Sequence, residues 1–128
     1  MRFKEPKKIF IVDDDPMVAM ALQDKLTEDI EHNVKVFRTG EECLNCLEEN
    51  PNVIILDYYL NSVNSDAADG MEILKSIKSK LKNTHVIMLS SQERYGLAMQ
   101  TVQKGAEQYV IKDDKAYDKI AEMVKEME

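Results

Sequence analysis

Five short apolar runs alternate with helical patterns along the chain, and this alternation limits the possible folds more than any other feature. Each run is rich in β-branched residues, too short for a helix and too apolar for a strand at the surface. A β–α unit that repeats about five times predicts an α/β fold, in which helices cover both faces of a parallel sheet. The runs are residues 9–12, 34–37, 53–56, 85–89 and 108–111.

Local signals mark where the helices begin and end. Asp15 followed by Pro16 predicts an N-cap with proline at the first helical position. Thr39 predicts a second N-cap, and we expect its helix to continue as far as Asn50, where an Asn-Pro pair stops it. A helix over residues 94–104 has the weakest apolar stripe of the five, so packing should hold it least firmly.

Polar residues follow four of the five apolar runs. Asp13 and Asp14 come directly after the first run, and Asp57 closes the third. Ser90 follows the fourth run and Lys112 follows the fifth. Because the carboxyl ends of parallel strands meet at one edge of the sheet, we expect these side chains to lie close together.

Crowded carboxylates of this kind are best relieved by a hard divalent cation, and Mg²⁺ prefers oxygen ligands. A metal held by acids beside a lysine suits a phosphoryl group, because both cations neutralise its oxygens. A carboxylate can also act as the nucleophile and form an acyl phosphate. The pattern therefore predicts Mg²⁺-dependent phosphoryl chemistry at this edge.

Two cysteines, Cys43 and Cys46, form a C-x-x-C pair that has to be weighed as a redox or zinc site. A zinc site needs about four ligands, and the two histidines, His32 and His85, are not at motif spacing. Redox cysteines usually stand at the start of a helix, whereas Thr39 starts this helix before the pair. We therefore expect reduced cysteines that pack in the core.

Charge and hydropathy argue against two kinds of partner. The net charge is −7, and phosphate-backbone binding needs clusters of Lys and Arg, so we expect no direct contact with nucleic acid. No apolar run approaches the roughly 18 residues of a membrane span, and the basic N-terminal stretch lacks an apolar signal core. A cytoplasmic protein with no membrane contact is the simplest expectation.

The sequence resembles the receiver domain of two-component response regulators over essentially its whole length. Five segments carry the resemblance through their order and spacing: "IFIVDDDP", "VIILD", "DGMEILKSIK", "VIMLSS" and "KGAEQYVIK". The resemblance implies the flavodoxin-like (βα)5 fold, a doubly wound parallel sheet with strand order 2-1-3-4-5. It also implies a single receiver domain over residues 1–128, and we expect no output domain.

The resemblance further implies a phosphorylation site at the predicted edge of the sheet. Asp57 would be the phosphoacceptor and a ligand of Mg²⁺. Asp14 would bind Mg²⁺ directly, Asp13 would act largely through water, and the backbone carbonyl of Tyr59 would complete the protein ligands. Asp15 lies outside this set, and we expect it to serve only as the helix cap.

Three more residues match the catalytic and switch positions of the family. Lys112 takes the place of the invariant lysine and Ser90 that of the switch hydroxyl, and both would act with Asp57 in phosphoryl transfer. Tyr109 would be the aromatic switch. We expect the signal to leave through the surface formed by the fourth helix, the fifth strand and the fifth helix.

The implied function is that of a phosphoacceptor in a two-component phosphorelay. A sensor histidine kinase or a histidine phosphotransfer protein would supply the phosphoryl group, and a downstream protein would read the altered surface. We expect self-phosphorylation and slow self-dephosphorylation, but not an enzyme that turns over a substrate.

Three alternatives from other classes remain open. The acidic "DDDP" turn argues against a flavodoxin-type FMN binder, because it would repel a phosphate unless a metal were present. A small Mg²⁺-dependent phosphatase would need a second acid close to Asp57, and none follows it directly. A receiver-like module that binds its partners without phosphorylation is the third alternative.

Two stretches depart from the family pattern. The segment after Asp57, "YYLNSVNSDAADG", is several residues longer than usual and lacks the customary Met-Pro. The proline that normally follows the lysine is absent. We therefore predict a trans bond between Lys112 and Asp113, because a non-proline cis bond costs about 2.5–4 kcal/mol.

Tyr59 and Gln92 occupy the positions that tune water access in the family. The bulk of Tyr59 predicts slow self-dephosphorylation.

Overall fold

A five-stranded parallel sheet forms the centre of the computed structural model, which describes residues 5–60, 69–91 and 95–127. The strand order is β2-β1-β3-β4-β5, and all neighbouring strands are parallel, which confirms the predicted doubly wound fold. Each strand lies within one residue of its predicted bounds. The strands are β1 (Lys8–Val12), β2 (Asn33–Phe37), β3 (Val53–Asp57), β4 (His85–Ser90) and β5 (Gln108–Ile111).

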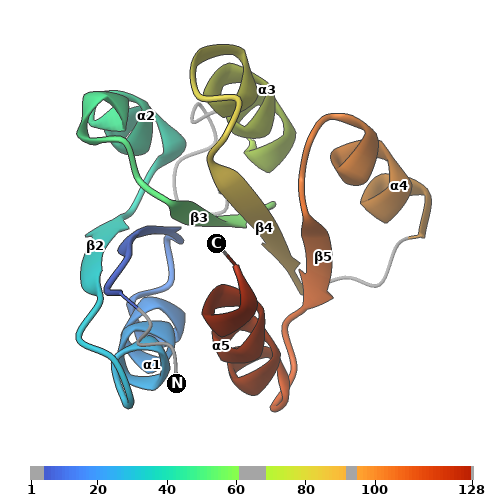
Figure 1. Cartoon of the computed structure of the whole chain (residues 1–128). Helices are drawn as coiled ribbons and strands as arrows, with labels where there is room; N and C mark the ends of the chain where they lie inside the picture. Colours follow the sequence, from blue (N-terminus) through green and yellow to red (C-terminus); the bar gives the residue numbers. More distant parts are fainter. Residues whose placement is uncertain (1–4, 61–68, 92–94, 128) are drawn as a thin grey trace.

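Helices cover both faces of this sheet (Figure 1). Helices α1 and α5 lie on one face, and α2, α3 and α4 lie on the other. The strand order reverses between β1 and β3, and in open α/β sheets the crevice outside the carboxyl ends at such a point is the usual ligand site. The helices are α1 (Pro16–Leu26), α2 (Gly40–Leu44), the 3₁₀ helix η1 (Leu47–Glu49), α3 (Gly70–Lys80), α4 (Tyr95–Gln103) and α5 (Ala116–Glu126).

Each face of the sheet carries its own apolar layer, because successive strand residues point to opposite sides. In β1, Ile9 and Ile11 pack on the side of α1 and α5, while Phe10 and Val12 pack on the side of α2 and α3. Strand β3 is buried along its whole length, including its last residue, Asp57. An acid at the buried end of a central strand has no packing reason to be there.

Two predicted helix caps are present. Asp15 accepts a hydrogen bond from the N–H of Met17 at 3.0 Å, and Pro16 opens α1. Thr39 accepts a hydrogen bond from the N–H of Glu42 at 3.2 Å at the start of α2. Both helices therefore begin where the sequence predicts.

The second helix is shorter than predicted. The expectation of one helix as far as Asn50 is wrong, because α2 ends at Leu44 and η1 follows it. The N–H of Cys46 bonds to the carbonyl of Cys43 at 3.0 Å, a tighter spacing than that of an α-helix. This turn keeps both Cys43 and Leu47 in the core. Asn50 ends η1 with a φ of 54°, a left-handed conformation that asparagine tolerates better than most residues.

Replacement of Asp15 by alanine is expected to lower the free energy of unfolding by about 1 kcal/mol, because α1 loses its cap. Asp15→Asn removes the same negative charge but keeps a capping side chain, so its stability should stay close to that of the wild type. Urea unfolding followed by circular dichroism measures both variants. An alanine variant as stable as the asparagine variant would contradict the capping role.

Candidate functional site

The carboxyl ends of four strands bring polar side chains to one edge of the sheet. Asp13 follows β1, Asp57 ends β3 and Ser90 ends β4. Lys112 follows β5, and its N–H donates to the carbonyl of Ser90 at 2.7 Å. The structure therefore gathers these residues at the edge where the topology places them.

Asp13 and Asp57 are held in the same way. Oδ1 of Asp13 accepts a hydrogen bond from the N–H of Asp15 at 2.9 Å, as in an Asx turn. Oδ1 of Asp57 accepts one from the N–H of Tyr59 at 3.2 Å. The second oxygens, Oδ2 of Asp13 and Oδ2 of Asp57, lie 3.1 and 3.3 Å from Nζ of Lys112. One ammonium group is thus shared by two carboxylates whose other oxygens are fixed by the backbone.

Both acids are almost completely shielded from solvent. Asp13 is 2% exposed and Asp57 is 3% exposed, whereas Asp14 is half-buried. One carboxylate oxygen from each of these three acids lies within 4.8 Å of the others. In the part of the chain that the structure describes, no other group of three or more His, Cys, Asp or Glu residues is placed to hold a metal ion.

Burial controls the ionisation of this cluster. It raises the pKa of Asp57 to about 7, helped by the negative charge of Asp13 and opposed by Lys112. Burial also raises the pKa of Asp13, against the N–H of Asp15 and the charge of Lys112. Burial alone would lower the pKa of Lys112, but the two neighbouring carboxylates outweigh it and raise that pKa. Lys112 therefore keeps its positive charge and interacts with both carboxylates.

The side chains of this cluster fit a hard divalent cation. Three carboxylates face one ammonium group, which leaves an excess of negative charge that a divalent cation would neutralise. Oδ2 of Asp13 is buried and accepts no well-aligned hydrogen bond from any described residue, although Nζ of Lys112 lies near it. Carboxylate oxygens are also the ligands that Mg²⁺ prefers. Asp13, Asp14 and Asp57 could therefore hold such an ion.

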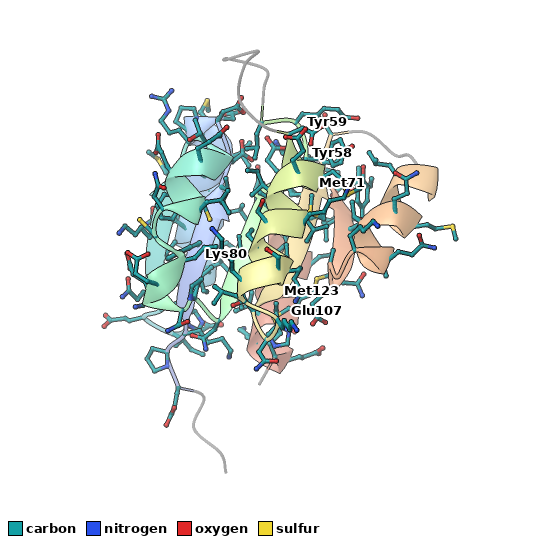
Figure 2. All side chains as sticks on the ribbon, turned by 90° about the horizontal axis from the view of Figure 1, so that it is seen from above. Tyr58, Tyr59, Met71, Lys80, Glu107 and Met123 are labelled. Atoms are coloured by element: carbon teal, nitrogen blue, oxygen red, sulfur yellow. The ribbon has the colours of Figure 1, made fainter. Side chains whose placement is uncertain are left out.

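Two adjacent tyrosines follow Asp57. The rings of Tyr58 and Tyr59 pack edge to face, with centroids 4.9 Å apart and an interplanar angle of 73°. Figure 2 shows both near Met71, in the first turn of α3, at the end of the molecule away from Glu107. Tyr58 therefore restrains the ring of Tyr59. Gln92, the other position expected to tune water access, lies outside the described residues.

The two predicted switch residues, Ser90 and Tyr109, lie on the same face of the sheet. Ser90 is fully buried, and Tyr109 is half-buried against the apolar layer on the side of α2 and α3. Alternation along β4 puts Ser90 on the same side as Met88, and Met88 pairs with Tyr109 on the neighbouring strand. The two side chains thus occupy adjacent strands on one side of the sheet.

The chain after Lys112 turns without a proline. The described residues contain no cis peptide bond, which confirms the predicted trans bond between Lys112 and Asp113. Oδ1 of Asp113 accepts a hydrogen bond from the N–H of Lys115 at 2.9 Å, and its carbonyl accepts one from the N–H of Ala116 at 3.2 Å. Asp113 therefore directs the chain into α5.

The sequence also predicts an unusually long segment after Asp57. Most of it, residues 61–68, lies outside the described residues.

The cysteine pair is not part of this site. Cys43 is fully buried, and burial raises the pKa of its thiol to about 12, with a smaller contribution from Cys46. A reactive cysteine needs the opposite shift, because the thiolate is the nucleophile and the metal ligand. Both cysteines are unpaired thiols, as predicted, and Cys43 belongs to the core between the sheet and α3.

A family model for the response regulator receiver domain matches residues 9–125, nearly the whole chain. The chain belongs to this family. Solved receiver domains share its fold: the BeF3-activated receiver domain of DrrB matches with a TM-score of 0.80 and 32% identity, over 94% of this chain and 95% of that one. The Mn²⁺-bound form of response regulator Rcp1 matches with a TM-score of 0.75 and 27% identity, over 94% and 90% of the two chains.

Curated relatives are longer than this receiver domain. A protein-glutamate methylesterase/protein-glutamine glutaminase of Archaeoglobus fulgidus is 32% identical over 123 residues, which cover 94% of this chain but 34% of the relative. The response regulator VraR of Staphylococcus saprophyticus is 27% identical, over 94% of this chain and 56% of the relative. None of the described helices is long and apolar enough to cross a membrane.

Gly70 is a neighbour of the receiver site that sequence patterns alone do not reveal. Its N–H donates to the carbonyl of Tyr58 at 2.8 Å, directly beside the residue that ends β3. The Asp-Gly pair that begins α3 is the available signal, and such pairs mark many kinds of turn. The contact itself depends on how two segments pack.

Asp57→Asn is expected to stabilise the receiver domain at about pH 8 when divalent cations are absent. Because the pKa of Asp57 in the fold is about 7, above the ordinary 3.8, the ionised carboxylate destabilises the native state at high pH. This destabilisation of the native state decreases as the pH falls through 7 towards 4, because Asp57 becomes protonated in the fold. The gain in free energy of unfolding should therefore be largest at about pH 8, at most about 4 kcal/mol, and should vanish near pH 4.

Urea unfolding of both proteins in EDTA, repeated across this pH range, measures the difference. Asp24→Asn is the matched control, because it removes an exposed carboxylate from α1. We expect no comparable dependence on pH for that variant. An Asp57→Asn gain of equal size at both ends of the pH range would contradict the account.

Proposed function

We propose that Asp57 accepts a phosphoryl group from a phosphohistidine of a sensor histidine kinase or a histidine phosphotransfer protein, in a reaction that requires Mg²⁺. One observation carries this proposal: a buried carboxylate at the end of β3 lies 3.3 Å from Lys112 and beside two further acids. Burial of several carboxylates side by side costs free energy. Such clusters of acids with shifted pKa values are typical of functional sites.

The proposed reaction exchanges one phosphorus bond for another. A carboxylate oxygen of Asp57 attacks the phosphorus, the P–N bond to the donor imidazole breaks, and an acyl phosphate forms. Lys112 offers an ammonium group to the negative oxygens of the transferring group. Mg²⁺, when bound, supplies further positive charge to the same oxygens. The ligands we propose for it are the carboxylates of Asp13, Asp14 and Asp57 and the carbonyl of Tyr59.

The acceptor is oriented before the donor arrives. The N–H of Tyr59 holds Oδ1 of Asp57, while Lys112 contacts Oδ2. A carboxylate held on both oxygens cannot turn freely, and such orientation removes part of the entropic barrier to the reaction. Asp13 is held in the same way, so the choice of Asp57 as the acceptor rests on its match to the phosphoacceptor position of the receiver family.

Two similar proteins support the same chemistry. The DrrB receiver domain was solved in a BeF3-activated form, and beryllofluoride is a phosphoryl mimic. Response regulator Rcp1 was solved in a Mn²⁺-bound form. Both belong to the fold described above, and we propose that this chain binds a divalent cation and a phosphoryl group in the same way.

We further propose that phosphorylation shifts the surface built by α4, β5 and α5. The hydroxyl of Ser90 would turn towards a phosphoryl oxygen, and the ring of Tyr109 would follow into the space that this frees. Helix α4 already presents apolar side chains to solvent, since Met99 is 64% exposed and Val102 is 51% exposed. Exposed apolar side chains suit a surface that a downstream protein reads.

Incubation of the wild type with acetyl phosphate and Mg²⁺ is expected to add the mass of one phosphoryl group. Asp57→Asn should lose this gain completely, and EDTA should abolish it in the wild type. Intact-mass spectrometry provides the measurement. Asp15→Asn is the matched control, because it removes a neighbouring acid but keeps the cap of α1, and it should label like the wild type.

Two outcomes would contradict the proposal. Labelling of Asp57→Asn at the level of the wild type would place the phosphoryl group elsewhere. A wild type that stays unlabelled in Mg²⁺, also with a phosphohistidine donor, would favour the alternative of a receiver-like module that binds partners without phosphorylation.

Tyr59→Ala is expected to shorten the half-life of the phosphorylated protein several-fold. The bulky ring beside the acyl phosphate obstructs the path of an attacking water, and alanine opens it. Tyr59→Phe keeps the ring and should leave the half-life nearly unchanged. Intact mass recorded over time, after the phosphodonor is removed, gives the rate. A half-life that is equal or longer in the alanine variant would refute the shielding role.

A further inference from the structure

The backbone that leaves Asp57 is held from two sides. The N–H of Tyr58 donates to the carbonyl of Leu89 in β4 at 2.9 Å. The carbonyl of Tyr58 accepts a hydrogen bond from the N–H of Gly70, the first residue of α3, at 2.8 Å. Tyr58 is therefore clamped between the neighbouring strand and the start of the following helix.

Gly70 approaches this backbone more closely than any other residue type could. A Cβ atom on residue 70 would lie 2.6 Å from Cα of Tyr58 and 2.7 Å from the carbonyl oxygen of Asp57. Both neighbours are backbone atoms, which cannot turn away as a side chain can. Gly96 in α4 differs in this respect, because a Cβ there would meet no heavy atom within 4 Å.

The two hydrogen bonds that hold Tyr58 lie next to the groups that take part in the proposed reaction. Tyr58 lies between Asp57 and Tyr59, and the N–H of Tyr59 bonds to Oδ1 of Asp57 at 3.2 Å. The Tyr58 carbonyl and the Tyr59 N–H belong to one planar peptide unit, so any rotation of this unit moves the N–H that holds Asp57. The carbonyl of Tyr59 follows in the next peptide unit. Leu60, the next residue, is 1% exposed and anchors the chain on the far side.

We infer that Gly70 is a positioning residue for the phosphorylation site: it fixes the Tyr58 peptide so that the Tyr59 carbonyl is aligned for Mg²⁺ and Asp57 for the phosphoryl group. This inference rests on the proposed function. The hydrogen bond from Gly70 to Tyr58 brings the chain back to the point where it leaves β3.

The affinity for Mg²⁺, measured by calorimetric titration of the metal alone, tests this inference. Gly70→Ala should bind Mg²⁺ about tenfold more weakly than the wild type, in line with other losses of residues that support metal ligands. Gly96→Ala is the matched control: it adds the same methyl group at an exposed position of α4, where it would meet no heavy atom within 4 Å, so its affinity should stay unchanged. Circular dichroism verifies that each variant is folded.

A milder pair of variants covers the case in which Gly70→Ala does not fold. Asp69 caps α3 through the N–H of Glu72 at 3.1 Å. Asp69→Ala removes this cap and loosens Gly70, whereas Asp69→Asn removes the same charge and keeps a capping group. Mg²⁺ affinity should fall further in the alanine variant than in the asparagine variant.

The inference is overturned if folded Gly70→Ala binds Mg²⁺ like the wild type, or if Gly96→Ala loses as much affinity. Equal affinities for Asp69→Ala and Asp69→Asn would also overturn it. Labelling of the wild type by acetyl phosphate is measured in parallel. A wild type that binds Mg²⁺ but takes no phosphoryl group contradicts the proposed function and leaves the role of Gly70 in metal binding standing.

Discussion

The contact that Lys112 shares between the carboxylates of Asp13 and Asp57 is the interaction on which the rest of this structure depends. Its Nζ lies 3.1 and 3.3 Å from one oxygen of each acid, at the carboxyl edge of the sheet. One ammonium group cannot balance these two buried acids and the adjacent Asp14, so the cluster keeps an excess of negative charge. Burial, helped by the charge of Asp13, raises the pKa of Asp57, and the excess of negative charge fits a divalent cation.

The parallel sheet makes this concentration of charge possible. Its strands end at one edge, and burial of β3 on both faces shields the acid that ends it. The backbone then fixes the acids, through the N–H groups of Asp15 and Tyr59 and through the contact of Gly70 with Tyr58. Ser90, at the end of β4, lies on the side of the sheet that α2, α3 and α4 cover.

Much of the fold and of the site could be predicted from the sequence, because strands and caps are encoded locally. Apolar runs place each strand within one residue, and Asp15 caps α1 as its neighbours predict. Parallel topology alone brings Asp57 and Lys112 to the same edge. The break between α2 and η1 could not be predicted, because its apolar spacing suits an α-helix equally well. The close approach of Gly70 depends on packing between two segments, which no local pattern records.

Amide NMR spectra in Mg²⁺, recorded before and after addition of beryllofluoride, test the central claim most directly. The account predicts shifts at Asp57 and its neighbours and along residues 90–112, including Ser90 and Tyr109. Asp57→Asn should show none of these shifts. Wild-type spectra that do not change, or changes confined to residues 58–70, would contradict the account.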